Sequence, residues 1–169
     1  MKRNAAKTIA LGGVMAALAV VIMSMGGMIP LATYVSPVLC MLILNFVYRL
    51  CGARIAWAWY GAVAVLSLLL SADKEAAAVF AFLGYYPIVK PRLDALKFSL
   101  LWKLLLFNGI TVVMYWLLMT VFGMDAIAEE FRAMGTLMLL VTLLLGNVTF
   151  LLTDRILGGR IKKKNRGGA

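Results

Sequence analysis

The chain has 169 residues, of which 64% are hydrophobic and only 14% are charged, and this composition excludes an ordinary soluble domain. Its formal net charge of +10 would suit a nucleic-acid-binding protein. The basic residues flank long apolar stretches, however, which is the pattern of membrane topology. We therefore expect a protein of the cell membrane that attracts anionic lipid at its cytoplasmic face and has no nucleic-acid partner.

The apolar stretches predict six transmembrane helices, because about 20 apolar residues cross a bilayer. They lie at about residues 8–28, 31–50, 55–72, 76–87, 98–122 and 134–157. The charged segment from Lys90 to Lys97 is expected as a loop, and the acidic segment from Asp125 to Arg132 as a loop or a short surface helix. The predicted fold is an all-α, polytopic six-helix membrane bundle. It forms a single domain over residues 1–157, followed by a basic, disordered tail at 158–169.

The charges between these helices predict the orientation. With the N-terminus in the cytoplasm, 15 of the 17 basic residues fall on the cytoplasmic side, and only Lys74 and Arg132 fall outside. Every loop then agrees with the positive-inside rule. We therefore expect both termini to be cytoplasmic.

The first predicted helix is unusually rich in small residues. Gly12 and Ala16 are four residues apart, as are Gly13 and Ala17, so they form a smooth strip where another helix backbone can approach closely. The pattern predicts close packing and leaves open whether a helix of this chain or of a partner packs there.

Residues for catalysis are scarce in the sequence. It contains no histidine, no HExxH or G-x-S-x-G motif and no P-loop. Cys40 and Cys51 lack the spacing of a metal site. We expect a non-catalytic protein without metal or cofactor.

Polar and aromatic residues within the predicted helices are candidates for ligand binding. We expect an outward-facing pocket for a small organic molecule, capped by the longest outer loop. Its candidate residues are Tyr34, Tyr115, Trp116, Thr120, Asn147 and, in that loop, Glu129 and Arg132. Two alternatives stay open: the aromatic residues form a belt at the membrane interface, and the asparagines Asn45, Asn108 and Asn147 form hydrogen bonds between helices.

Lysines 97 and 103 flank the start of the fifth predicted helix. Both can extend to the cytoplasmic interface beside Trp102, since a lysine buries its apolar stem and keeps its ammonium in water.

The stretch GGVMAALAVV and the following Ile29-Pro30-Leu31 resemble a known family. They are similar to the first helix and first outer loop of the substrate-binding S-components of energy-coupling factor (ECF) vitamin transporters. The resemblance implies that Gly12, Gly13, Ala16 and Ala17 dock on a transmembrane T-component, that two cytoplasmic ATPases drive the complex, and that the chain binds a micronutrient.

Two other functions remain open. The small residues of the first predicted helix are equally consistent with a membrane scaffold or assembly partner, which needs no ligand. A small lipid-acting enzyme would have to use residues near the inner face, namely Asp94, Lys97, Tyr85 or Tyr86, and it lacks a conventional acid–base pair.

Overall fold

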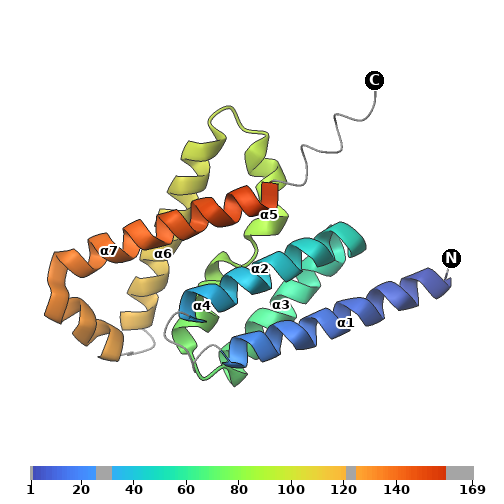
Figure 1. Cartoon of the computed structure of the whole chain (residues 1–169), viewed down its shortest axis with the longest axis horizontal. Helices are drawn as coiled ribbons and strands as arrows, with labels where there is room; N and C mark the ends of the chain where they lie inside the picture. The colour runs from blue at the N-terminus through green and yellow to red at the C-terminus, as the bar shows by residue number, and fades with distance from the viewer. Residues whose placement is uncertain (1, 26–31, 121–124, 159–169) are drawn as a thin grey trace. The chain divides into compact units, whose positions relative to one another are not determined.

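The computed structural model (Figure 1) describes residues 2–25, 32–120 and 125–158, with side chains for all of these except 2–8, 32, 125–134 and 136–139. Those residues form seven α-helices and no strand. In chain order the helices are α1 (Lys2–Met25), α2 (Ala32–Cys51), α3 (Ala53–Leu70), α4 (Lys74–Leu83), α5 (Tyr86–Asp94), α6 (Ser99–Thr120) and α7 (Asp125–Gly158). The predicted all-α class is confirmed.

Four helical stretches within the described ranges are long and apolar enough to cross a membrane. They are Thr33–Cys51, Ala53–Leu70, Ser99–Thr120 and Leu140–Gly158. These stretches match the second, third, fifth and sixth predicted helices, and the apolar part of α1, Ile9–Met25, is shorter. The lengths and the apolar composition are compatible with a membrane-embedded protein.

The fourth predicted helix is not one continuous helix. Residues 74–94 form α4, with 10 residues, and α5, with nine. At a rise of about 1.5 Å per residue, each is at most about half as long as the hydrocarbon core of about 30 Å is thick. The expectation of a loop from Lys90 onward is wrong, because α5 continues to Asp94. Pro87 stands in the first turn of α5, where its fixed φ favours a helix start.

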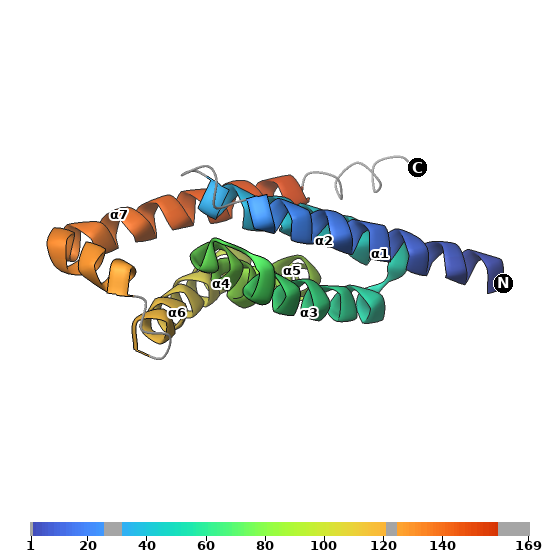
Figure 2. The same cartoon turned by 90° about the horizontal axis from the view of Figure 1, so that it is seen from below.

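The helices belong to two compact units, Met1–Leu96 and Lys97–Ala169. In the first unit, α1 packs against α2 and α3, and α4 packs against the same two helices (Figures 1 and 2). The core is built largely from small side chains, including the fully buried Ala19, Cys40, Ala56, Ala76 and Ala77. Small residues let helix backbones approach closely, so this unit is held by packing along smooth faces.

A single glycine joins α2 to α3. Gly52 has a φ of 82°, in the region that favours glycine, and its N–H bonds to the carbonyl of Tyr48 at 3.0 Å. This positive φ lets the chain reverse direction over one residue, in the short connection between the helices predicted at 31–50 and 55–72.

The turn between α3 and α4 ties three helix ends together. The Thr33 hydroxyl, at the start of α2, donates to Asp73 Oδ2 at 2.6 Å. Asp73 Oδ1 accepts the backbone N–H of Ala76 at 2.9 Å and so caps α4. The Ser71 hydroxyl donates to the carbonyl of Met23, in the last turn of α1, at 2.9 Å. Asp73 is thus an N-cap and a helix-to-helix acceptor rather than only a solvated loop carboxylate.

The second unit is a hairpin of α6 and α7. Gly135 interrupts α7 with φ 57° and ψ −140°, a backbone conformation that few other residues adopt, so residues 125–134 and 136–158 are two helices joined by a kink. The short helix before Gly135 agrees with one of the two expectations for the acidic segment. The predicted tail from residue 159 onward lies outside the described residues, and the single domain over 1–157 stays a prediction.

We predict that Asp73→Ala lowers the free energy of unfolding by about 1–2 kcal/mol, because α4 loses its N-cap and Thr33 loses its acceptor. Equilibrium unfolding by SDS in mixed micelles measures the effect. The control is Asp73→Asn, which keeps a side-chain oxygen for the cap and should cost less. An alanine variant as stable as the unmodified protein would contradict this role.

Candidate functional site

One face of α1 is used inside the first unit. The indole Nε1 of Trp59 donates to the carbonyl of Gly12 at 3.1 Å. The thiol of Cys40 lies 3.5 Å from the carbonyl of Ala19. Gly12 and Ala19 are buried, and their carbonyls accept these donors from neighbouring helices. This face of α1 therefore packs within the chain.

The neighbouring face of α1 is open in the first unit. Ala10, Gly13 and Ala17 are exposed and lie at i, i+3 and i+7, on one side of the helix. A Cβ added to Gly13 would meet no heavy atom within 4 Å. The four predicted docking residues thus divide: Gly12 faces inward, Ala16 is half-buried, and Gly13 and Ala17 face outward. We call Ala10, Gly13 and Ala17 the open strip.

Polar residues join the two helices of the second unit. Lys103 Nζ lies 3.2 Å from each carboxylate oxygen of Asp154. The two side chains are only 6% and 19% exposed. A charge taken out of water is costly unless it is paired, so this ion pair ties the start of α6 to the end of α7.

Next along the hairpin, the amide of Asn108 donates to Asn147 Oδ1 at 3.1 Å, and Asn147 donates back to Asn108 Oδ1 at 2.9 Å. Each amide also donates to a carbonyl of its own helix, at 2.8 Å and 2.7 Å. Both N–H groups of each amide therefore have an acceptor. Of the two interpretations of Asn147, the structure contains the hydrogen bond between helices.

Between these polar pairs, the rings of Phe107 and Phe150 stack with their centroids 4.6 Å apart. Gly146 makes room for Phe107, because a Cβ on Gly146 would lie 3.2 Å from Phe107 Cζ. We call the polar pairs and this aromatic pair the α6–α7 seam, whose residues are Lys103, Phe107, Asn108, Asn147, Phe150 and Asp154. A one-residue shift would separate every pair, so the seam fixes the register of the hairpin.

The pairing of Lys103 with Asp154 is not among the predictions from the sequence. The sequence does contain a sign of it: Lys103 lies about one turn inside α6, and Asp154 lies about one turn before the end of the following helix. Two helices that run antiparallel bring such positions together. Lys103 is buried here and does not extend to the interface as expected.

The residues of the predicted pocket are divided between the two units. Tyr34 is 39% exposed on α2, in the first unit, and the other candidates belong to the second. Trp116 is 60% exposed on α6, Tyr115 is half-buried, and the Thr120 hydroxyl donates to the carbonyl of Trp116 at 2.6 Å. The side chains of Glu129 and Arg132 lie outside the described residues. The pocket stays a prediction.

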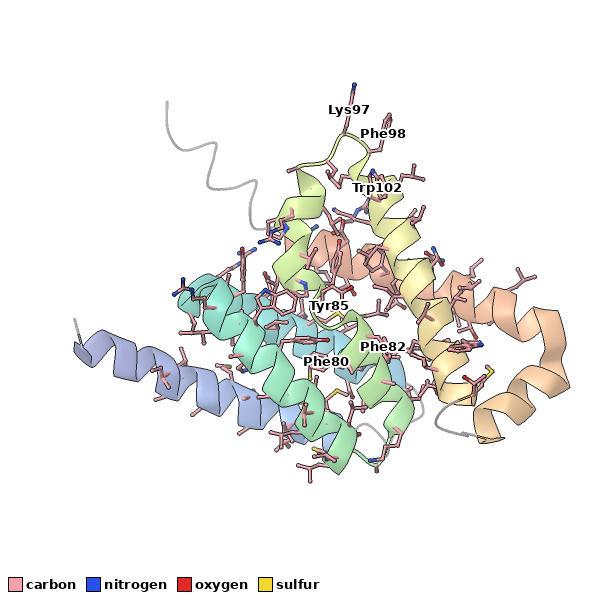
Figure 3. All side chains as sticks on the ribbon, turned by 180° about the vertical axis from the view of Figure 1, so that it is seen from behind. Phe80, Phe82, Tyr85, Lys97, Phe98 and Trp102 are labelled. Carbon is pink, nitrogen blue, oxygen red and sulfur yellow. The ribbon has the colours of Figure 1, made fainter. Side chains whose placement is uncertain are left out.

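The residues considered for a lipid-acting enzyme have contacts within the first unit, apart from Lys97. Asp94 pairs with Lys90 at 3.5 Å. The ring of Tyr85 stacks on that of Trp57, with centroids 6.1 Å apart, and meets the edge of Tyr60 (Figure 3). Tyr86 is buried. Within the described part of the chain, no group of three His, Cys, Asp or Glu residues is placed to hold a metal ion.

Comparison of the chain with protein-family models, with curated proteins and with solved structures finds no match.

We predict that Lys103→Met or Asp154→Leu alone lowers the free energy of unfolding by roughly 3 kcal/mol, because each leaves an uncompensated charge in an apolar helix pair. The double variant removes both charges and should recover most of the loss. SDS titration of the four proteins in mixed micelles completes the double-mutant cycle. If the two single effects simply add, Lys103 and Asp154 do not act as a pair.

Proposed function

We propose that the chain is a non-catalytic integral membrane subunit that docks on a partner helix through the open strip of α1. On the resemblance of its first helix to S-components, we propose that it is the substrate-binding subunit of an ECF-type importer for a small organic micronutrient. A transmembrane T-component and two cytoplasmic ATPases are its proposed partners.

The proposed topology has six membrane crossings, with both termini in the cytoplasm of a cell membrane. The fourth crossing consists of the two short helices α4 and α5. The outer face of α6 supports membrane insertion, because its exposed side chains are apolar while the opposite face carries the seam. Trp102 and Trp116 are both exposed on this outer face. They are 14 residues apart, or about 21 Å along the helix, so they lie toward its two ends.

The observation that carries the docking proposal is the division of small residues on α1. Gly12 and Ala19 already serve packing inside the first unit. The open strip is a second line of small residues, and a Cβ at Gly13 would meet no heavy atom within 4 Å. Val14 and Leu18 lie beside the strip and are 64% and 47% exposed. A smooth line of small residues beside larger ones suits the close approach of another membrane helix.

A membrane scaffold is the second candidate function. Asn147 is engaged by Asn108 and Thr120 by the backbone of Trp116, so two proposed ligand-binding groups have hydrogen-bond partners in their own unit. A scaffold needs the open strip and no ligand.

We predict that Ala17→Leu or Gly13→Leu reduces recovery of membrane partners with the tagged chain at least five-fold, because a leucine on the open strip would keep a partner helix from approaching closely. Quantitative mass spectrometry of proteins purified from native membranes measures the recovery. The matched control is Ala62→Leu, at an exposed position on α3.

Equal recovery by the Ala17→Leu and Gly13→Leu variants and the unmodified chain would overturn the docking proposal. Extraction of small molecules from the same purified protein distinguishes an importer subunit from a scaffold. An importer subunit should retain a small organic molecule or be stabilised thermally by a member of a vitamin panel, and a scaffold should show neither.

A further inference from the structure

The beginning of α6 carries an exposed surface that mixes a positive charge with large apolar groups. Lys97 is exposed just before the helix. Phe98, Leu101 and Trp102 are 65%, 62% and 52% exposed. Figure 3 shows Lys97 and Phe98 pointing away from the ribbon at the connection into α6. With Arg155 these residues form what we call the basic–aromatic edge.

Lys97 and Lys103 have opposite environments although they are only six residues apart. Lys103 lies on the inner face of α6, with Phe107, and pairs with Asp154. Phe98, Leu101 and Trp102 lie on the outer face, away from α7. The basic–aromatic edge is therefore not part of the seam and remains available in the second unit.

Arg155 belongs to the same end of the hairpin. The Lys103–Asp154 pair places the end of α7 beside the start of α6, and Arg155, the next residue, is exposed. From Arg155 to the C-terminus the sequence contains six basic residues and no acidic one. Among the described residues at this end of the hairpin, Lys103 and Asp154 neutralise each other, so Lys97 and Arg155 leave a net positive charge.

We propose that the basic–aromatic edge binds the headgroups of anionic phospholipids. This inference rests on the membrane insertion in the proposed function. It names the residues through which the cytoplasmic end of the hairpin recognises anionic lipid.

The close mixture of charge and apolar surface favours a lipid over a soluble acidic partner. Phe98 and Leu101 present apolar surface, while Lys97 and Arg155 present positive charge at the same end of the hairpin. A bilayer interface supplies both, because acidic phosphates lie directly above hydrocarbon. Trp102 fits the same place, since its ring is apolar and its N–H remains a hydrogen-bond donor.

Electron paramagnetic resonance of spin-labelled lipids tests the proposal on the full chain in phosphatidylcholine vesicles. The measured quantity is the association of labelled phosphatidylglycerol relative to labelled phosphatidylcholine. We expect the unmodified chain to prefer phosphatidylglycerol, and this preference to shrink in 1 M salt, where the screening length falls from about 10 Å to about 3 Å. The double variant Lys97→Gln/Arg155→Gln should lower the preference about two- to five-fold, and Lys97→Arg/Arg155→Lys should keep it.

Several outcomes would overturn the proposal. The Gln/Gln variant could keep the full preference, or removal of residues 159–169 alone could abolish it, which would assign it to the tail. Equal association of the two lipids with the unmodified chain would also contradict the proposal while leaving membrane insertion supported. Absence of an immobilised component for either lipid would instead contradict membrane insertion, and with it the proposed function.

Discussion

Polar groups within apolar helices are costly unless they find partners inside the protein, and the arrangement of both units depends on this constraint. Among the described residues, the buried Ser67 hydroxyl is the exception. In the second unit Lys103 pairs with Asp154 and Asn108 with Asn147, which sets the register of α6 against α7. In the first unit the same requirement is met mainly through the backbone. Donors on α2 and α3 bond to carbonyls of α1 on the face that carries Gly12 and Ala19. Side-chain pairs and bonds to backbone carbonyls are thus two solutions to one problem.

The faces that remain after this pairing are apolar and differ between helices. The outer face of α6 carries large side chains, such as Trp116 at 60% exposure, and suits the hydrocarbon of a bilayer. The open strip of α1 instead carries only small side chains, which offer little apolar surface to a lipid chain and let a helix backbone approach closely. This contrast is why we assign the first face to lipid and the second to a partner helix.

The sequence was sufficient for much of the fold, because helix class and four of the apolar stretches follow from composition and length. It was not sufficient where the outcome depends on long-range contacts. The fourth predicted helix ends at about residue 87, whereas α4 ends at Leu83, because Pro87 is equally compatible with the end of one helix and the start of the next. The partner of Lys103 was missed because pairing requires the register of two helices. The division of small residues on α1 could not be predicted either, since Gly12 and Gly13 are equivalent until the position of Trp59 is known.

Thiol accessibility on the outer face of α6 tests most directly whether these apolar faces lie in lipid. Cys40→Ala and Cys51→Ser remove the two native thiols, and Val112→Cys then introduces a single one. Val112 is 58% exposed, so the new thiol is open to reagents in the protein itself. A bilayer around α6 would shield it. We predict that a membrane-impermeant maleimide leaves Val112→Cys unmodified in intact and in opened vesicles, while Lys97→Cys reacts from the cytoplasmic side. Rapid modification of Val112→Cys in intact membranes would contradict it.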